Sequence, residues 1–233
     1  EVVKKIGYKD DPGVDILSVL LDHDIQPEFP EEVMAEVRNI PQTVQEEEKK
    51  NRRDLTDVVT VTIDGDSSKD FDDAVSVCRT DNGYNLKVSI ADVSHYVKEG
   101  SALDTEALKR SFSTYVTDRV VPMLPHELSN GICSLNPHVE RLALTCDMNV
   151  DLDGNIVDYE VYPSVIRSTE RMTYNNVNKI LNGNQRVQKE YEHLGDLFFV
   201  LRDCADAIRK QRIHKGAIEF DSVESEIIVD VDG

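Results

Sequence analysis

Residues 62–75 read TIDGDSSKDFDDAV and place five aspartates between two segments that alternate like β-strands, 58–63 and 74–79. The aspartates are Asp64, Asp66, Asp70, Asp72 and Asp73. Carboxylates this close repel one another, so a fold that keeps them together needs positive charge or water among them. Carboxylate oxygens are the ligands that hard ions such as Mg²⁺ prefer. The stretch therefore predicts a divalent metal site on a loop at the end of a sheet.

An EF-hand loop and a solvated acidic loop are two other interpretations of the acidic residues. An EF-hand loop needs glycine at its sixth position and glutamate at its twelfth, and a loop counted from the first of these aspartates has lysine and valine there. Segment 151–155, DLDGN, begins like such a loop but has Ile156 where the glycine is required, so a hairpin turn explains it better. A solvated acidic loop without a ligand is the open alternative, although Phe71 and the flanking apolar strands favour a loop anchored near the core.

Composition limits the function classes. The 233 residues carry 45 acidic and 26 basic side chains, a formal net charge of −19. This charge argues against a general electrostatic nucleic-acid binder, but it does not exclude an enzyme that meets phosphates through bound metal. The four cysteines include no CxxC pair, which argues against a zinc knuckle or a disulfide framework. With no apolar run long enough to span a membrane and no leader, we expect a cytoplasmic protein without a membrane partner.

Periodicity divides the chain near residue 50. Residues 1–50 read as a helical lead-in or linker, with apolar residues at helical spacing in 14–21 and a second helix from 30 to 37. From residue 51 onward, strands and helices alternate, which predicts a mixed α/β (α+β) domain over 51–233. Each half of this domain contains a predicted hairpin, the first turning at Asn82-Gly83 and the second joining 142–150 to 156–166.

Helices are predicted where capping residues precede an apolar periodicity. Ser101 is a predicted N-cap for a helix through residue 110, and Thr173 for a helix through residue 181. A longer helix is predicted over 187–211, with its apolar stripe in the core. The segment between the first of these helices and the second hairpin is rich in Pro, Ser and Asn and predicts a long irregular connection. A final strand is predicted at 226–229.

Four of the aspartates, Asp64, Asp70, Asp72 and Asp73, resemble the signature of the RNB catalytic domain of the RNase II/RNase R exoribonucleases. The likeness extends over nearly all of 51–233. It continues in the order of the family through VSIADVSHYVKEGSALDTEA (88–107), YVTDRVVPMLPHELSNGICSLNPHVERLALTC (115–146), VIRSTERMTYNNV (165–177) and KGAIEFDSVESEIIV (215–229). The KGAIEFD and NGICSLNP runs are closer to RNase R.

The resemblance implies an RNB-type fold with a central mixed sheet flanked by helices. It also implies processive hydrolysis of single-stranded RNA from its 3′ end to nucleoside 5′-monophosphates, with Mg²⁺ (Mn²⁺ as the alternative ion) as cofactor and DNA not expected as the main substrate. The four aspartates would form the catalytic and metal-binding set. In it, Asp64, Asp70 and Asp73 are ligands, and Asp72 is the residue most critical for cleavage, positioning metal or attacking water. Asp66 lies outside the family pattern.

Two tyrosines match family positions along the RNA. Tyr115 matches a tyrosine that stacks on a base at the 3′ terminus, and its alternative is a half-buried loop tyrosine. Tyr174 matches a position along the RNA path, and its alternative is packing at a helix start. For Arg167 and Arg171, contact with phosphates and pairing with nearby acids stay equally open. Phe112 departs from the small residues that the family has before its stacking tyrosine.

The resemblance also implies parts that this sequence lacks. Cold-shock domains would precede residue 1, and the second half of the RNB domain, with a catalytic arginine, and an S1 domain would follow residue 233. We therefore expect the N-terminal part of the catalytic domain only, inactive or weakly active in isolation. The rival hypotheses are a catalytically inactive RNA- or protein-interaction module that keeps the fold, and a structural metal-binding domain.

Overall fold

The structure is a computed structural model, and it describes residues 5–8, 10–117 and 119–220. The chain forms two compact units. The smaller contains the described residues up to Ile40 together with Val97–His126 and Phe220, and the larger contains Pro41–Tyr96 and Glu127–Glu219. The predicted strand at 226–229 lies outside the described residues.

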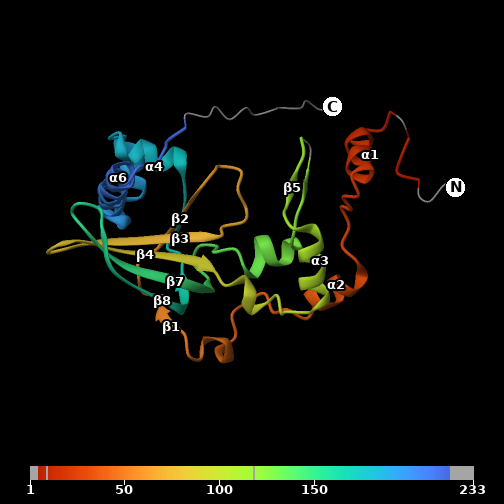
Figure 1. Cartoon of the computed structure of the whole chain (residues 1–233), viewed down its shortest axis with the longest axis horizontal. Helices are drawn as coiled ribbons and strands as arrows, with labels where there is room; N and C mark the ends of the chain where they lie inside the picture. Colours follow the sequence, from red (N-terminus) through yellow and green to blue (C-terminus); the bar gives the residue numbers. More distant parts are fainter. Residues whose placement is uncertain (1–4, 9, 118, 221–233) are drawn as a thin grey trace. The chain divides into compact units, whose positions relative to one another are not determined.

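A seven-stranded mixed sheet forms the centre of the larger unit, in the order β1-β8-β7-β4-β3-β2-β9 (Figure 1). Its strands are β1 (Arg53–Leu55), β2 (Val61–Asp64), β3 (Asp73–Thr80), β4 (Gly83–Ala91), β7 (Glu140–Asp151), β8 (Ile156–Arg167) and β9 (Glu170–Thr173). Pairs β1–β8 and β2–β9 are parallel, whereas the other neighbours are antiparallel. The predicted mixed α/β class with a central mixed sheet is confirmed.

Both predicted hairpins are present, and each depends on a glycine. Gly83 has φ +149°, and a Cβ at this position would lie 2.1 Å from the backbone oxygen of Val150 on the neighbouring strand β7. Gly154 has φ +83° in the turn between β7 and β8, where a Cβ would lie 2.1 Å from the backbone oxygen of Ala207. Only glycine fits these two close approaches of backbone to backbone.

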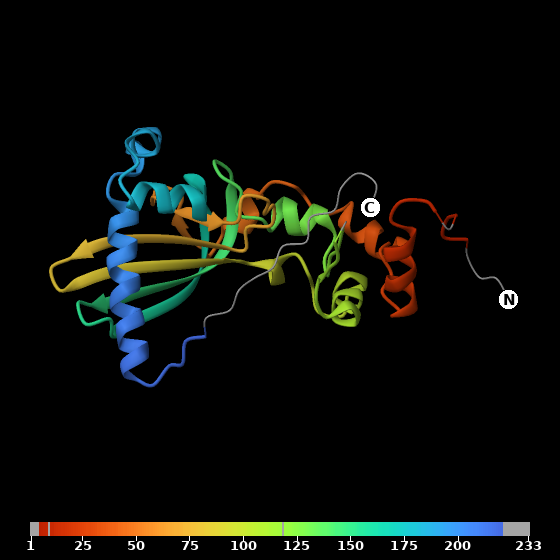
Figure 2. The same ribbon diagram turned by 90° about the horizontal axis from the view of Figure 1, so that it is seen from above.

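Helices α4 (Tyr174–Leu181), α5 (Gln185–Glu190) and α6 (Leu197–His214) belong to the larger unit. Figure 2 shows α6 crossing the strands on one face of the sheet. The core on this face is apolar and combines strand and helix residues: Val61, Val77, Tyr84, Val150, Met172, Ile180, Leu194, Leu197, Phe198, Val200 and Cys204. The predicted apolar stripe is thus largely in the core.

The prediction of one continuous helix over 187–211 is wrong. The chain instead forms α5, one helical turn at Glu192–Leu194, and α6. Gly195 has φ +59°, a left-handed conformation that a continuous right-handed helix does not allow. The apolar periodicity continues across the break because both segments pack on the same core, and for that reason it gave no sign of the break.

A second core lies on the opposite face of the sheet, since successive residues of β3 point to opposite sides. Its buried members are Leu55, Phe71, Ala74, Ala91, Leu135, Ala143, Tyr162 and Ile166. Besides the turn at Glu192–Leu194, short helical segments of the larger unit lie at Glu46–Lys49, Val93–His95 and Glu127–Ile132. Phe71 is the member of this core that belongs to the aspartate stretch.

The smaller unit contains α1 (Val14–Asp22), α2 (Glu31–Val37), α3 (Ala102–Arg110) and a two-stranded sheet of β5 (Thr114–Tyr115) and β6 (Val120–Val121). Ser101 caps α3 as predicted, accepting a hydrogen bond from the Asp104 amide over 3.0 Å. The Glu36 carboxylate accepts from the amides of Leu103 and Ala102 in the first turn of α3, and these bonds lower its pKa. The connection predicted as irregular thus contains β5, β6 and the turn at Glu127–Ile132.

Among the described residues, no helix combines the length and the apolar composition that a membrane crossing requires.

Candidate active site

The aspartate stretch joins two neighbouring strands of the sheet. Asp64 is the last residue of β2 and Asp73 is the first residue of β3, so residues 65–72 form the loop between them (Figure 1). Strands β2 and β3 are antiparallel. The carboxylates therefore gather at one end of the sheet, where the sequence predicted them.

Phe71 anchors this loop to the core. Its side chain is 6% exposed, and its backbone amide donates to the Ser134 hydroxyl over 3.0 Å. Its backbone oxygen accepts from the Leu135 amide over 2.8 Å. A loop held in this way differs from the freely solvated acidic loop that was the alternative interpretation.

Asp72 is fixed through its backbone. The Ala91 amide at the end of β4 donates to the Asp72 backbone oxygen over 2.9 Å. This bond continues the β3–β4 pairing by one residue beyond the ladder, which begins at Asp73 opposite Ile90. The Asp72 side chain lies at the surface, so its carboxylate is held on a defined backbone while it faces solvent.

The carboxylates act on one another electrostatically. The pKa of Asp64 is raised by partial burial first, then by Asp73, with smaller contributions from Asp70 and Asp72, while Arg171 acts in the opposite direction. The pKa of Asp72 is raised by the protein atoms around its carboxyl, then by Asp70 and Asp73. Mutual repulsion of this kind is relieved by a cation. The four aspartates of the family signature thus form one electrostatic group.

The donor chemistry of this group fits a hard divalent ion, because all its side-chain donors are carboxylate oxygens. Within residues 5–8, 10–117 and 119–220, however, no three acidic, histidine or cysteine side chains stand in a geometry that would hold a metal. An ion at this loop would have to draw the carboxylates together or take further ligands from a substrate phosphate.

Asp66, the aspartate outside the family pattern, has a different environment. Its carboxylate accepts a hydrogen bond from the side-chain amide of Asn175 in the first turn of α4. Its backbone oxygen accepts from Nη2 of Arg171 over 2.9 Å. Asp66 is thus tied to the β9–α4 junction.

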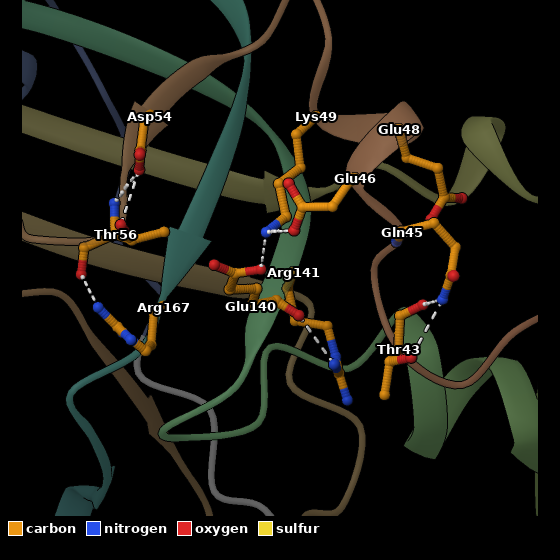
Figure 3. A network of polar contacts seen from close by, with 10 residues as sticks. All are labelled: Thr43, Gln45, Glu46, Glu48, Lys49, Asp54, Thr56, Glu140, Arg141 and Arg167. Carbon is orange, nitrogen blue, oxygen red and sulfur yellow. Dashed lines mark hydrogen bonds and ion pairs between the residues drawn. The ribbon is translucent and has the colours of Figure 1, made fainter.

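The two arginines for which the sequence left alternatives open make different contacts. Arg171 contacts backbone oxygens of the aspartate loop, at 2.8 Å for Gly65. Arg167 donates to the backbone oxygen of Thr56 over 3.4 Å (Figure 3). Its guanidinium also lies 3.7 Å from the exposed carboxylate of Asp57. Arg167 therefore pairs with acid at the surface, and Arg171 supports the loop.

Figure 3 also shows how the charged segment before β1 joins the sheet. Lys49 pairs with Glu46 at 2.7 Å and with Glu140 at the start of β7. On the same turn, the Glu48 carboxylate lies 2.8 Å from Nε2 of His95. The side chains of this charged segment fasten it to β7 and to His95.

The predicted RNA-binding tyrosines lie in different units. Tyr174 is the first residue of α4 and is 60% exposed. Tyr115 lies on β5 of the smaller unit and is 70% exposed. Neither ring is in a core cluster, so the half-buried and packing alternatives do not describe them, and both rings are available to a ligand.

Sequence reasoning missed Ser134 and Asn175, which hold the aspartate loop. Both lie in segments that resemble the family, NGICSLNP and RMTYNNV, yet a serine or an asparagine in such a run has no spacing that marks it. Only the fold brings them to a loop that is more than 60 residues away in the sequence.

Comparison with known proteins agrees with this geometry. Residues 52–233 match the RNB domain family. Ribonuclease R of Thermotoga maritima is 50% identical over 237 residues, which cover 100% of this chain and 33% of that protein. Ribonuclease R 1 of Lactococcus lactis is 46% identical, over 100% of this chain and 28% of that protein. This chain thus spans about a third of the length of these relatives.

A solved structure of Mycoplasma genitalium RNase R in complex with double-stranded RNA matches with a TM-score of 0.88 and 35% identity, over 97% of this chain and 40% of that one. The match to the family model, the sheet and the aspartate loop lead to the same assignment: the chain belongs to the RNB domain family.

Proposed function

We propose that this chain carries the carboxylate part of the active site of an exoribonuclease that hydrolyses RNA processively from the 3′ end to nucleoside 5′-monophosphates. The proposed substrate is the 3′ end of single-stranded RNA. The relatives named Ribonuclease R support the reaction class, and their greater length leaves other parts of the site to sequence outside this chain.

One observation carries the proposal. Asp64, Asp70, Asp72 and Asp73 stand at the end of the sheet on a loop that is anchored by a buried aromatic ring, and their charges act on one another. A fold that only needed a turn between β2 and β3 would gain nothing from this repulsion. Carboxylates whose pKa is raised by neighbouring charges are frequent at functional sites.

The chain's own residues would bind and orient. When bound, Mg²⁺ or Mn²⁺ lowers the pKa of a water and neutralises charge on the phosphate. Asp64, Asp70 and Asp73 would hold the ion, and Asp72 would orient the ion or the attacking water. The bond from Ala91 keeps the Asp72 backbone in line with β3, so its carboxylate stays at the strand end where the other three gather.

The exposed tyrosines would serve the RNA. Stacking of Tyr115 on a terminal base would be tolerant of sequence, because every base has a π-face. Tyr174 lies directly before Asn175 and three residues after Arg171 in the sequence. It would therefore contact RNA beside the aspartate loop. Such contacts suit an acidic protein, because stacking does not require a basic surface.

A second function has one observation in its favour. The structure of yeast Ssd1, described as a pseudonuclease, matches with a TM-score of 0.71 at 22% identity, so the fold is also found in a protein of that description. The intact set of four aspartates weighs against a non-catalytic module here, because a pseudonuclease has no use for their repulsion.

The test is hydrolysis, by the natural protein that carries this chain, of a single-stranded RNA that is labelled at every nucleotide, with and without Mg²⁺. We expect nucleoside 5′-monophosphate release that needs the ion and that Asp72→Asn abolishes. Asp57→Asn, at a fully exposed aspartate of the same unit, is the matched control. Unchanged release by Asp72→Asn would refute the site, and absence of release from the parent protein would favour the non-catalytic module.

A further inference from the structure

We infer that Arg171 is a positioning residue that holds the first half of the aspartate loop in the shape the carboxylates need. The inference deepens the proposed function and rests on it. Arg171 itself would touch neither metal nor RNA and would act through the loop backbone.

The contacts of Arg171 converge on one segment. Its Nη2 lies within hydrogen-bonding distance of three carbonyl oxygens of the turn, at 2.8 Å for Gly65, 2.9 Å for Asp66 and 3.4 Å for Ser68. The turn also closes on itself, since the Ser68 amide donates to the Gly65 oxygen over 3.2 Å. A single cationic donor thus gathers the carbonyl oxygens of residues 65, 66 and 68.

The sheet places Arg171 for this task. It lies on β9, which pairs in parallel with β2, and it stands opposite Thr62 in the register. Two residues further, Asp64 stands opposite Thr173, where β2 ends and the loop begins. The guanidinium therefore extends along the end of β2 and reaches the turn that follows it.

A second tie comes from the same junction. Asn175, four residues after Arg171, donates from its side-chain amide to the Asp66 carboxylate. Thr173 between them caps α4 by accepting from the Asn176 amide over 3.2 Å. The cap fixes the start of α4, and this in turn fixes the direction of Asn175.

The guanidinium group fits this position better than other cations. Its charge and planar shape suit several oxygens that lie in one direction, whereas a lysine presents a compact point charge. The Nε atom of Arg171 is buried without a hydrogen-bond partner among the described residues. The side chain thus keeps this conformation although one donor is unsatisfied, which indicates that the carbonyl contacts dominate its placement.

The loop is consequently held from two sides. Ser134 and Ala91 hold residues 69–72 through Lys69, Phe71 and Asp72, and the β9–α4 junction holds residues 65–68. Without the second support, repulsion among the carboxylates would spread the loop. Groups that orient metal ligands typically change metal affinity or activity 10–100-fold when they are mutated.

The test compares Arg171→Lys with Arg167→Lys, a matched change at an exposed arginine of the same sheet. Hydrogen exchange of the amides of 65–70 is measured alongside the Mg²⁺ concentration that gives half-maximal RNA hydrolysis. For Arg171→Lys we expect exchange about 10-fold faster in this loop and a half-maximal Mg²⁺ concentration raised about 10-fold. RNA affinity without metal should stay within about twofold, because Arg171 would not touch RNA.

Rescue separates positioning from general support of the fold. Methylguanidinium added to Arg171→Ala should restore slow exchange of the loop and lower the Mg²⁺ requirement, whereas ammonium of equal concentration should not. If Arg171→Ala fails to fold, Asn175→Ala provides the second variant, with faster exchange expected at Asp66.

The outcomes distinguish this inference from the proposed function. If Arg171→Lys does not change the hydrogen exchange of the amides of 65–70, the inference is overturned, whether or not the protein degrades RNA. Faster exchange with an unchanged Mg²⁺ requirement would also overturn it, because the loop would then not position the carboxylates. Faster exchange in Arg171→Lys, together with a parent protein that does not hydrolyse RNA, would support the hold of Arg171 on the loop. It would refute the proposed function on which the inference rests.

Discussion

The Ser134 hydroxyl accepts a hydrogen bond from the Phe71 amide over 3.0 Å and donates one to the Lys69 backbone oxygen over 3.2 Å. Ser134 is fully buried. One side chain therefore satisfies two backbone groups of the aspartate loop, and it comes from a segment that the chain reaches only after β4 and α3.

Replacing Ser134 with alanine should lower the free energy of unfolding. The substitution leaves the Phe71 amide and the Lys69 oxygen without this partner, and a buried unsatisfied group costs about 1–3 kcal/mol. Urea titration followed by circular dichroism measures the change. Ser67→Ala, at an exposed serine of the same loop, is the control and should stay within about 0.5 kcal/mol. Equal stability of the two variants would contradict the role of Ser134.

The ion pair between Arg52 and Asp92 predicts a stability effect that depends on pH. Nη2 of Arg52 lies 2.6 Å from the Asp92 carboxylate, and both side chains are about nine-tenths buried. Burial raises the pKa of Asp92, but the hydrogen bonds from Arg52 and Ser94 outweigh burial and lower it. A lowered folded-state pKa means that the pair stabilises the protein above the ordinary pKa of aspartate and loses this effect as pH falls through the folded value.

Arg52→Ala should therefore cost about 3–5 kcal/mol at pH 7, because it leaves a buried charge without its partner. The cost should shrink toward pH 4, where Asp92 in the variant can take up a proton. Urea unfolding at both pH values measures it, with Arg202→Ala as the control, since the exposed pair with Asp203 should contribute only about 0–1 kcal/mol. A cost for Arg52→Ala that is the same at both pH values would show that lost packing, not the unpaired charge, causes it.

Features with a local chemical cause could be predicted from the sequence. The caps at Ser101 and Thr173 are present because a side-chain oxygen next to a helix start finds an unpaired amide within three residues. The Asn82-Gly83 hairpin is present for a similar reason, since its geometry depends on adjacent residues. The aspartate loop belongs to the same group, because its residues lie within one short stretch.

Features that depend on distant residues could not be predicted. Strand β1 is only three residues long, and it exists because it pairs with residues 164–166 of β8, more than 100 positions away. The supports of the loop are of the same kind, since Arg171 reaches Gly65 across the β2–β9 pair. An arginine in an acidic chain suggests phosphate or carboxylate partners, and neither alternative includes the backbone carbonyls that it contacts.

The exposed ring of Tyr115 predicts an effect on RNA binding that does not involve the aspartates. Tyr115→Ala should weaken binding of a short single-stranded RNA by about 1–3 kcal/mol, the range for one base stacked on an aromatic side chain. Tyr115→Phe should bind nearly as the parent does, because it keeps the ring. Fluorescence anisotropy without metal measures the affinities. Tyr159→Ala removes a tyrosine of similar exposure on β8 and should change little, so an equal loss in both alanine variants would refute a specific stacking role.

Asp72→Asn should remove RNA hydrolysis while leaving the fold at least as stable as the parent. The pKa of Asp72 is raised by its surroundings and by Asp70 and Asp73. A carboxylate with a raised folded-state pKa destabilises the fold when it is ionised, and this penalty disappears as pH falls through that pKa. The variant should therefore unfold at an equal or higher temperature than the parent at pH 7, and the difference should vanish in acid.

Mg²⁺ should also reduce this difference in unfolding temperature between Asp72→Asn and the parent, because an ion that binds only the folded parent stabilises that state by mass action. Thermal unfolding at the two pH values, with and without Mg²⁺, measures each effect, and Asp57→Asn should behave as the parent throughout. A variant that is less stable than the parent at pH 7 would show that Asp72 supports the fold, and its loss of hydrolysis would then say nothing about catalysis.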